Sequence, residues 1–585
     1  MKKVYGIDLG TTYSAVATLN DSGLPEIIEN FADGKPILAS AVFFPDGEDP
    51  VVGEAAKNQL EVNPHAVIQF VKRQIGKSDA QEWEFDGVKY DPITISALIL
   101  KRMVEYAADQ GHDVKDVVIT CPAYFGNEER NATRQAGQIA GLNVLDIVNE
   151  PTAAAFNYLA REFKESRKIM IYDLGGGTFD ITLFDFSVED DGSTVIDVIR
   201  SGGNDKLGGA DWDNRLFNYI ADLYVDEVGS IERSDLDKDG ELKQKIRTIV
   251  ETTKIGLTGM KNRSFTINHD GDTARLEVTR DKFEEITSDL LARTIDYVNS
   301  LLSDSDTTPD QVDIVLLVGG STKMPMVKAA VEAVFPNSQV RFEEPDLAVA
   351  KGAALAAAVE GNRRIENYIA SKESGGSADE SLFDDGIETI FDEDELPKTV
   401  EEAKALMHDL PQSLGQGTTT IIDKLSRSFG PAVRCLNTNN FIVDNLLFVW
   451  DKSPSEASQV YRIPTNCANL PEISTVDVPI YENTMERDED PIIISDMYGN
   501  EVYNDPALLL KKLGEITIEI PSYTSADALI EFTIRARGAG LDVVARNPDT
   551  NQIFEADFPT EHTKSAEEMA EAIAHVGSLT TKGDH

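Results

Sequence analysis

The sequence has few cysteines and no long apolar run. Its three cysteines, Cys121, Cys435 and Cys467, are odd in number and widely spaced, which favours reduced thiols over a disulfide framework. No stretch reaches the roughly 18 consecutive apolar residues of a membrane-spanning helix, and the amino terminus enters an apolar strand pattern without the features of a secretion signal. We therefore expect a soluble, cytoplasmic protein.

Basic residues are also scarce. Lysine and arginine number 54 against 102 aspartates and glutamates, for a formal net charge of −48. Such a surface repels nucleic-acid phosphates and anionic lipids, so neither nucleic acid nor a membrane is expected as a partner. An acidic linker and adaptation to salt both produce this composition, and both interpretations stay open.

A strand-and-turn pattern is present twice. Residues 4–12 read V-Y-G-I-D-L-G-T-T, and residues 169–178 read I-M-I-Y-D-L-G-G-G-T. In each copy an apolar strand leads to an aspartate and a turn whose backbone amides can approach an anion closely. Because Asp8 and Asp173 would repel phosphate, their predicted role is to hold a hydrated Mg²⁺ between phosphates. Two such turns, facing each other, predict a nucleotide site on a duplicated domain.

A third apolar strand strengthens this interpretation. Residues 314–318 read I-V-L-L-V and continue into G-G-S-T-K at 319–323, where small residues allow a nucleoside to approach the backbone. A single D-L-G turn is most often an ordinary tight turn. Three matched strand-to-glycine turns favour the nucleotide interpretation.

Further motifs surround these turns. They are G-I-D-L-G-T-T at 6–12, V-K-R-Q-I-G at 71–76, C-P-A-Y-F at 121–125, N-E-P-T-A-A-A at 149–155, D-L-G-G-G-T-F-D at 173–180, L-G-G-A-D-W-D-N-R at 207–215 and G-G-S-T-K at 319–323. In order and spacing the set resembles the nucleotide-binding domain of DnaK-type 70-kDa heat-shock chaperones. Actin and sugar-kinase relatives share only the phosphate turns. The resemblance implies an α/β, actin-like, two-lobed ATPase domain followed by an all-β sandwich.

The resemblance also implies roles for individual residues. ATP or ADP, Mg²⁺ and a potassium ion are the expected ligands. The expected catalytic residues are Lys72, Glu150, Asp173 and Thr178, with Lys72 placed to stabilise charge that grows on the γ-phosphoryl group. The expected metal-associated residues are Asp8, Asp173 and Asp180. The expected nucleotide-binding residues are Gly10, Thr11, Thr12, Tyr13, Gly175, Gly176, Gly177, Thr178, Gly208, Gly209, Glu251, Lys254, Thr258, Gly319, Gly320, Ser321, Lys323 and Asp346.

Two departures from the family pattern stand out. Ile255 and Lys323 occupy the positions of two adenine-stacking arginines, and neither offers a planar guanidinium to a purine face. Many members also carry an arginine just before N-E-P-T that meets a J-domain aspartate, whereas this chain has Asp146. Like charges would then face each other. Base selectivity and a J-domain co-chaperone are therefore in doubt.

The expected domain division has four parts. Residues 1–360 form the ATPase domain, and residues 361–422 form an acidic, largely flexible linker with one short helix opened by Thr399 and Glu402. Residues 423–560 form a β-sandwich resembling the family's substrate-binding domain, where Val476 and Val478 match pocket positions. Residues 561–585 form a short helix, opened by Ser565 and Glu568, and a tail in place of the family's helical lid.

One further motif is interpreted as a decoy. Residues 235–240 read D-L-D-K-D-G, like the start of a calcium loop. The closing bidentate glutamate of such a loop should stand at position 246, where the chain has Ile246. An exposed loop is therefore expected.

The favoured function is that of an ATP-dependent chaperone that binds and releases unfolded polypeptide. It is expected to be a monomer and to work with a nucleotide-exchange factor. The intact set of Lys72, Glu150 and Thr178 favours this enzyme over the alternative, a non-hydrolysing regulator or exchange partner of a housekeeping chaperone. The β-rich tail disfavours a filament-forming actin relative.

Overall fold

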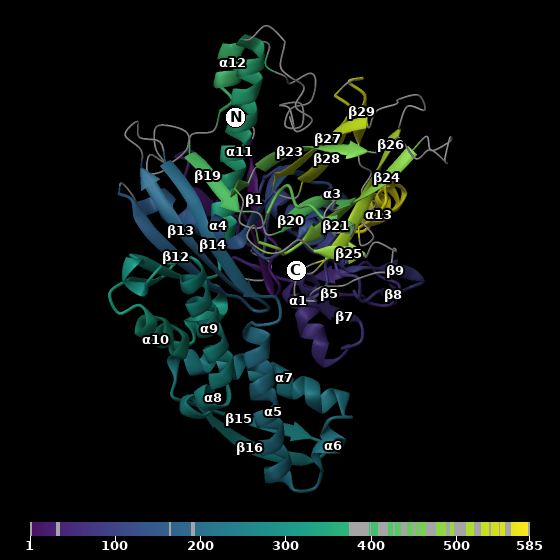
Figure 1. Ribbon diagram of the computed structural model, residues 1–585. Coiled ribbons are helices and arrows are strands. Elements are labelled where there is room, and N and C mark those ends of the chain that lie inside the picture. The colour runs from purple at the N-terminus through teal and green to yellow at the C-terminus, as the bar shows by residue number, and fades with distance from the viewer. Residues whose placement is uncertain are drawn as a thin grey trace.

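The computed structural model describes most of the chain (Figure 1). The described residues are 3–582 except 31–34, 163–164, 189–193, 374–396, 398, 408–418, 425–426, 435–440, 449–451, 454, 464–474, 487–488, 490–491, 496–509, 520–527, 538–539, 549 and 556–562. The expected linker at 361–422 lies outside them at 374–396, 398 and 408–418, as do Cys435 and Cys467. Within the described part, every helix is too short or too polar to cross a membrane.

The first sheet contains the first copy of the duplicated strand. Its strands are β1 (Tyr5–Asp8), β2 (Tyr13–Leu19), β3 (Pro25–Ile27), β4 (Leu38–Ala39), β10 (Asp116–Cys121) and β11 (Asn143–Asn149). Their order is β11-β10-β1-β2-β3, with β4 paired to β2 outside that path. Strand β1 runs parallel to β10 and antiparallel to β2.

The second sheet repeats this pattern around the second copy. Its strands are β12 (Arg167–Leu174), β13 (Phe179–Val188), β14 (Thr194–Asn204), β17 (Ile314–Val318), β18 (Gln339–Phe342), β19 (Thr419–Lys424) and β22 (Lys452–Ser453). Their order is β18-β17-β12-β13-β14-β19-β22. Strand β12 runs parallel to β17 and antiparallel to β13, as β1 does to β10 and β2. The sequence duplication is thus a duplication of sheet topology, with Asp8 and Asp173 at equivalent strand ends.

Two helices rich in alanine pack between the sheets. They are α4 (Glu150–Glu162) and α11 (Ala348–Glu373). Their small side chains form a buried cluster with Ile169, Ile171 and Leu316 of the second sheet. At their crossing, an added Cβ atom on Gly352 would stand 1.6 Å from the Ala153 carbonyl oxygen, so no larger residue fits there. Helix α11 passes through the boundary expected at residue 360.

The outer face of the first sheet is covered by two further helices. They are α2 (Pro92–Ala108) and α3 (Asn127–Ile139). Helix α2 begins where Asp91 accepts a hydrogen bond from the Thr94 amide and Pro92 takes the first helical position. Near these helices lie the short elements α1 (Glu54–Asn58), η1 (Gln59–Glu61), η2 (Val71–Arg73), β5 (Ala41–Phe43), β6 (Val51–Val52), β7 (Val67–Gln69), β8 (Trp83–Phe85) and β9 (Val88–Tyr90). Strands β6, β5 and β7 form a small sheet in that order, directly before Lys72.

The outer face of the second sheet is covered by a larger helical group, drawn at the bottom of Figure 1. It consists of α5 (Gly209–Val228), α6 (Arg233–Leu236), α7 (Gly240–Gly259), α8 (Arg280–Ile286), α9 (Ser288–Asp304), η3 (Pro309–Gln311), η4 (Gly320–Lys323), α10 (Pro325–Val334) and the hairpin β15 (Asn262–His269) and β16 (Asp272–Thr279). The segment resembling a calcium loop is partly helical, since α6 takes its first residues. Asp239 accepts from the Leu242 amide and caps α7.

The C-terminal region contains two antiparallel sheets that share one apolar cluster. One sheet is formed by β20 (Ser428–Arg434), β21 (Phe441–Val443), β24 (Thr475–Asn483), β25 (Ile493–Ser495) and β26 (Lys511–Glu519), and the other by β23 (Ser455–Ile463), β27 (Ala528–Arg537), β28 (Gly540–Arg546) and β29 (Ile553–Glu555). The cluster joins Ile480 and Ile516 of the first to Phe532 and Val543 of the second. Pro479 lies inside β24 and not at a strand end. The pairing of β24 with β20 stops at Ile480, so the missing N–H of Pro479 removes no hydrogen bond to β20.

Three segments connect the C-terminal region to the rest. The short helix α12 (Val400–Lys404) is capped by Thr399, as predicted, and buries Ala403 beside α11. Strand β19 crosses the boundary expected at residue 422 and pairs in parallel with β14, extending the second sheet. Helix α13 (Ala566–Ser578), capped by Ser565 and Glu568 as predicted, lies against α2 and α3.

Candidate nucleotide site

The two predicted phosphate turns face each other. An added Cβ atom on Gly176 would stand 2.3 Å from the Thr12 hydroxyl oxygen, and one on Gly177 would stand 2.3 Å from a Thr11 methyl carbon. The second turn is closed by a 3.0 Å hydrogen bond from the Gly175 amide to the Thr178 carbonyl. Only glycine permits this approach, so the small residues of both motifs are explained by their opposition across one site.

The start of α5 packs against the second turn and forms hydrogen bonds with it. The Gly209 amide donates to the Gly175 carbonyl at 2.9 Å, and the Ala210 amide donates to the Gly176 carbonyl at 2.8 Å. A Cβ atom on Gly208 would stand 2.5 Å from the Gly177 carbonyl carbon. The L-G-G-A segment is therefore part of the same turn assembly.

Lys72 lies among four carboxyl groups beside these turns. It forms an ion pair with Glu150, and both side chains are at least nine-tenths buried. Asp8 accepts a 3.2 Å hydrogen bond from the Thr120 hydroxyl. Asp180 accepts a 3.0 Å hydrogen bond from the Ala123 amide. Asp173 completes the group at the end of β12, so the predicted catalytic and metal-associated residues lie at one place.

The electrostatics of this group call for a cation. Burial and the charge of Glu150 raise the pKa of Asp8 to about 7, although Lys72 and Thr120 act in the opposite direction. Burial and the neighbouring carboxylates also hold the pKa values of Asp173 and Asp180 well above their usual range. A single lysine does not neutralise four buried carboxyl groups. Their oxygens are the ligands that Mg²⁺ prefers, so the donor set fits that ion or its waters.

The site also contains residues that the sequence analysis missed. Arg73 donates to the Gly177 carbonyl at 2.9 Å and forms a 3.2 Å ion pair with Asp211. Lys57 donates to the Tyr13 hydroxyl at 2.9 Å and pairs with Glu251 at 2.7 Å. Because Arg73 directly follows Lys72 in the sequence, its presence in the site could have been predicted. Lys57 and Glu251 are 194 residues apart in the chain, so no local sequence pattern predicts their ion pair.

The expected base end of the site is more exposed to solvent than the phosphate end. Lys254 donates to the Gly209 carbonyl at 3.1 Å and pairs with Asp213 at 2.7 Å. The Ser321 hydroxyl donates to the Gly175 carbonyl at 2.9 Å, which ties the third turn to the second. Gly319 has a φ of 82° and packs against Asp173.

The residues in place of the stacking arginines are exposed. Ile255 has an exposed fraction of 63%, and Lys323 is about half exposed and forms an ion pair with Asp346. Thr258 and Lys254 line a neighbouring pocket with Glu284 and Met324. At the base end the chain thus has the apolar side chain of Ile255 and a lysine, Lys323, that is already paired with Asp346. The family has two arginines at these positions.

Val476 and Val478 lie apart from this site on β24. They pair with Ile518 and Ile516 of β26, and both are partly buried. Val478 also contacts the apolar cluster shared by the two C-terminal sheets. Val476 is therefore the clearer of the two candidates for contact with a ligand.

Comparisons with known proteins agree with this geometry. A family model described as "Hsp70 protein" matches residues 4–369. Curated proteins named "Chaperone protein DnaK" from Thermotoga neapolitana and Thermotoga maritima are 39% identical to this chain over 364 residues, covering 61% of this chain and 59% of each relative. The match thus spans about three fifths of those relatives. Because the family model matches more than half of the chain, the chain belongs to the Hsp70 family.

Proposed function

We propose that the chain hydrolyses ATP and uses that reaction to control the binding of unfolded polypeptide. The observation that carries the proposal is the opposition of the two phosphate turns around Lys72 and its buried carboxyl groups. Thr11, Thr12 and Thr178 would contact the phosphates through hydroxyl and amide groups. Lys72 would stabilise the charge that grows on the γ-phosphoryl group, and Glu150 holds the lysine in place.

Mg²⁺ fits the carboxyl groups of this site. Asp8, Asp173 and Asp180 would hold it, directly or through water, and the ion would neutralise phosphate charge. We extend the proposal to a potassium ion near Asp180, supported by the same excess of carboxyl groups. Phosphate release compared in potassium and sodium buffers tests that extension.

The architecture supports a division of labour. The two sheets of equal topology, with helices on their outer faces and α4 and α11 between them, fit an actin-like, two-lobed ATPase domain over residues 1–360 and the rest of α11. The two C-terminal sheets with one shared cluster fit a β-sandwich over residues 423–560. Residues 361–422 would form the linker, and residues 561–585 a helix and tail.

Strand β19 supports coupling between these parts. Its parallel pairing with β14 joins residues 194–197 to residues 419–422. Strand β14 pairs with β13, which pairs in turn with β12 and its Asp173. A change at the phosphate turns would therefore reach the start of the sandwich through neighbouring strands. The expected consequence is nucleotide-dependent exchange of an extended peptide held in apolar pockets.

Partners and location follow from the family and stay proposals. Asp146 lies 3.9 Å from a guanidinium nitrogen of Arg134, so a charge partner within the chain is already available. We propose that a J-domain contact, if one is used, differs from the common arginine–aspartate contact. A nucleotide-exchange factor, a monomeric state and a cytoplasmic location complete the proposal.

Peptide exchange by the full chain tests the chaperone function. A labelled, extended, apolar-rich peptide should bind and dissociate faster with Mg·ATP than with Mg·ADP. The Val476→Asp change should weaken binding by placing a charge in an apolar pocket, whereas Thr475→Asp, on the exposed face of the same strand, should not. Failure to bind any peptide of a broad library would make the C-terminal region a docking module and remove the chaperone function.

A further inference from the structure

The C-terminal segment 564–582, called here the strap, packs against α2 and α3 and joins the apolar core that also contains residues next to Lys72. Helix α13 buries Ala572 and Val576. Both belong to the same apolar cluster as Val71, Ile75 and Phe125. Val71 directly precedes Lys72, and Ile75 lies three positions after Lys72. The strap therefore shares one apolar core with the residues that flank Lys72.

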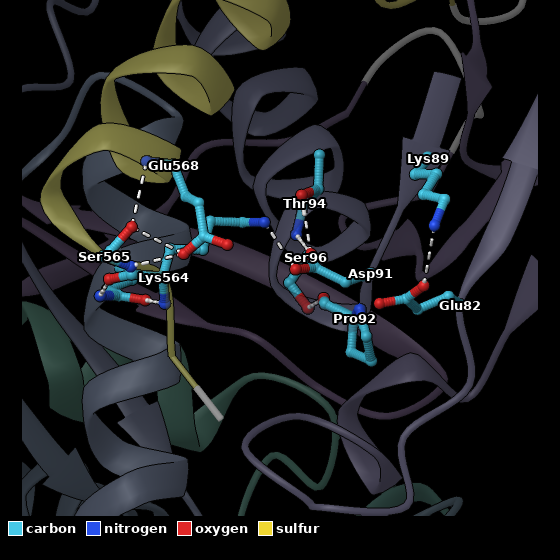
Figure 2. Close-up of polar contacts among 10 residues, drawn as sticks. Glu82, Lys89, Asp91, Pro92, Thr94, Ser96, Lys564, Ser565 and Glu568 are labelled. Atoms are coloured by element: carbon cyan, nitrogen blue, oxygen red, sulfur yellow. Dashed lines mark hydrogen bonds and ion pairs between the residues drawn. The ribbon is translucent and has the colours of Figure 1, made fainter. Parts of the chain in front are cut away.

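Polar contacts fasten the start of the strap (Figure 2). Lys564 pairs with Asp91 at 2.5 Å, and Asp91 also caps α2 through the Thr94 amide. The Gln135 side chain of α3 exchanges two hydrogen bonds with the Lys564 backbone, at 2.7 and 2.8 Å. A single lysine thus contacts the beginning of α2 and the middle of α3.

A second set of contacts fastens the end of the strap. Lys101 of α2 donates to the carbonyls of Val576 at 2.7 Å and Leu579 at 2.5 Å, which satisfies the C-terminal end of α13. Beyond it, the Lys582 amide donates to the Pro50 carbonyl at 3.1 Å, and the Val52 amide donates to the Lys582 carbonyl at 3.0 Å. Lys582 thereby pairs with the outer edge of β6.

That edge leads directly to the catalytic lysine. Strand β6 pairs with β5, and β5 pairs with β7. Strand β7 ends at Gln69, one residue before Phe70, which has a φ of 59°. A bulky residue in the left-handed region is held there only by its surroundings. Lys72 follows within the next turn. The strap is therefore connected to Lys72 through the paired strands β6, β5 and β7.

We propose that the strap is a positioning element for the Lys72 loop and links the C-terminal sheets to the hydrolysis site. Strand β29 of the second C-terminal sheet ends at Glu555, and the strap begins nine residues later. At its other end the strap is attached to the small sheet beside Lys72. This route is separate from the β19–β14 pairing. Its effect on turnover rests on the proposed ATPase function, but its effect on the loop does not.

Hydrogen exchange of the full chain tests the mechanical part. Three proteins are compared with the wild type: a truncation lacking residues 564–585, the variant Val576→Asp, and the matched control Ile573→Asp, whose apolar side chain is exposed on the same helix. Amides of residues 67–75 should exchange about tenfold faster in the first two and unchanged in the control. A synthetic peptide of residues 564–585 should restore slow exchange to the truncated protein. Unchanged exchange at 67–75 in both the truncation and Val576→Asp would overturn the proposal.

Single-turnover kinetics test the consequence for catalysis. The truncated protein should release phosphate about tenfold more slowly, with little change in ATP affinity, because the strap lies against α2, α3 and β6 and not at the phosphate turns. Equal turnover by truncated and wild-type protein would also overturn the proposal. A wild type that releases no phosphate would refute the ATPase function alone, and hydrogen exchange would still decide whether the strap positions the loop.

Discussion

The two ends of the nucleotide site are built in different ways. The phosphate end consists of backbone turns that interlock and of buried charges, with Gly176 and Gly177 pressed against two threonines and Lys72 held by Glu150. The base end includes side chains at the protein surface, with Ile255 exposed and Lys323 engaged by Asp346. The phosphate end leaves no room for larger side chains, whereas the side chains of Ile255 and Lys323 have open space around them.

This difference separates chemistry from recognition. In the proposed reaction only the phosphate end contacts the group that reacts, so hydrolysis should depend on that end. Affinity for the base depends on contacts that are equal before and during the reaction. We therefore expect changes at the phosphate end to alter turnover strongly and changes at the base end to alter affinity moderately.

The largest effect is expected from the catalytic lysine. The Lys72→Ala change should lower single-turnover phosphate release by roughly 10²–10³-fold, the usual loss when one donor to developing charge is removed, with ATP affinity largely kept. Lys328→Ala, which removes an exposed lysine from an i,i+4 pair with Glu332, is the matched control and should behave as the wild type. Equal losses of affinity and turnover in Lys72→Ala would show that the lysine only binds.

A smaller effect is expected from the turn itself. Gly177→Ala places a methyl group 2.3 Å from the nearest Thr11 atom. Overpacking costs about 1–3 kcal/mol, so ADP affinity should fall roughly tenfold to hundredfold. The control is Gly240→Ala, where an added Cβ meets nothing within 4 Å. Calorimetry that finds full ADP affinity in Gly177→Ala would mean that the turns do not hold the phosphates as packed here.

The base end should respond in the opposite direction. Restoring both guanidinium groups with Ile255→Arg and Lys323→Arg should tighten ADP binding by about tenfold, since each cation–π contact contributes about 0.5–2 kcal/mol. Turnover of saturating ATP should change little. Equal or weaker ADP affinity in the double variant would show that the base is held by other contacts, such as those of the pocket beside Thr258.

The smallest effect concerns pH at the phosphate end. The pKa of Asp8 is raised to about 7 without a bound cation, so this carboxyl group is protonated below that pH. Mg²⁺ must then displace a proton, and its affinity should fall severalfold as pH is lowered from about 8 to 6. Titration of Mg²⁺ into the ADP complex at several pH values measures this. An affinity that is flat over this range would place the ion away from Asp8.

The sequence predicted the phosphate end well because its signals are local. A strand, an aspartate and a glycine turn are consecutive in the chain, so the pattern carries the geometry. The repeat at residues 169–178 predicted that two turns would face each other, and the contacts of Gly176 and Gly177 confirm it. The caps at Thr399 and Ser565 were equally local and are confirmed.

Features that depend on distant partners were not predicted. The pairing of β19 with β14 joins segments more than 200 residues apart, and the strap reaches β6 from the other end of the chain. The Lys57–Glu251 pair has the same character. Periodicity and propensity report which face of an element is apolar, but they do not report which surface will cover it. Pro479 shows the same limit, because its place inside β24 depends on where the neighbouring ladder ends.

Phosphate release by the wild-type chain is the decisive test of the proposed hydrolysis. A stoichiometric amount of radiolabelled ATP is bound, and release is followed with Mg²⁺, with excess chelator, and in the Lys72→Ala variant. The account predicts first-order release that requires Mg²⁺ and nearly disappears in the variant, which still retains the labelled nucleotide. Release from the wild type no faster than from Lys72→Ala, with nucleotide bound to both, would contradict the account and leave the site a nucleotide-binding site without hydrolysis.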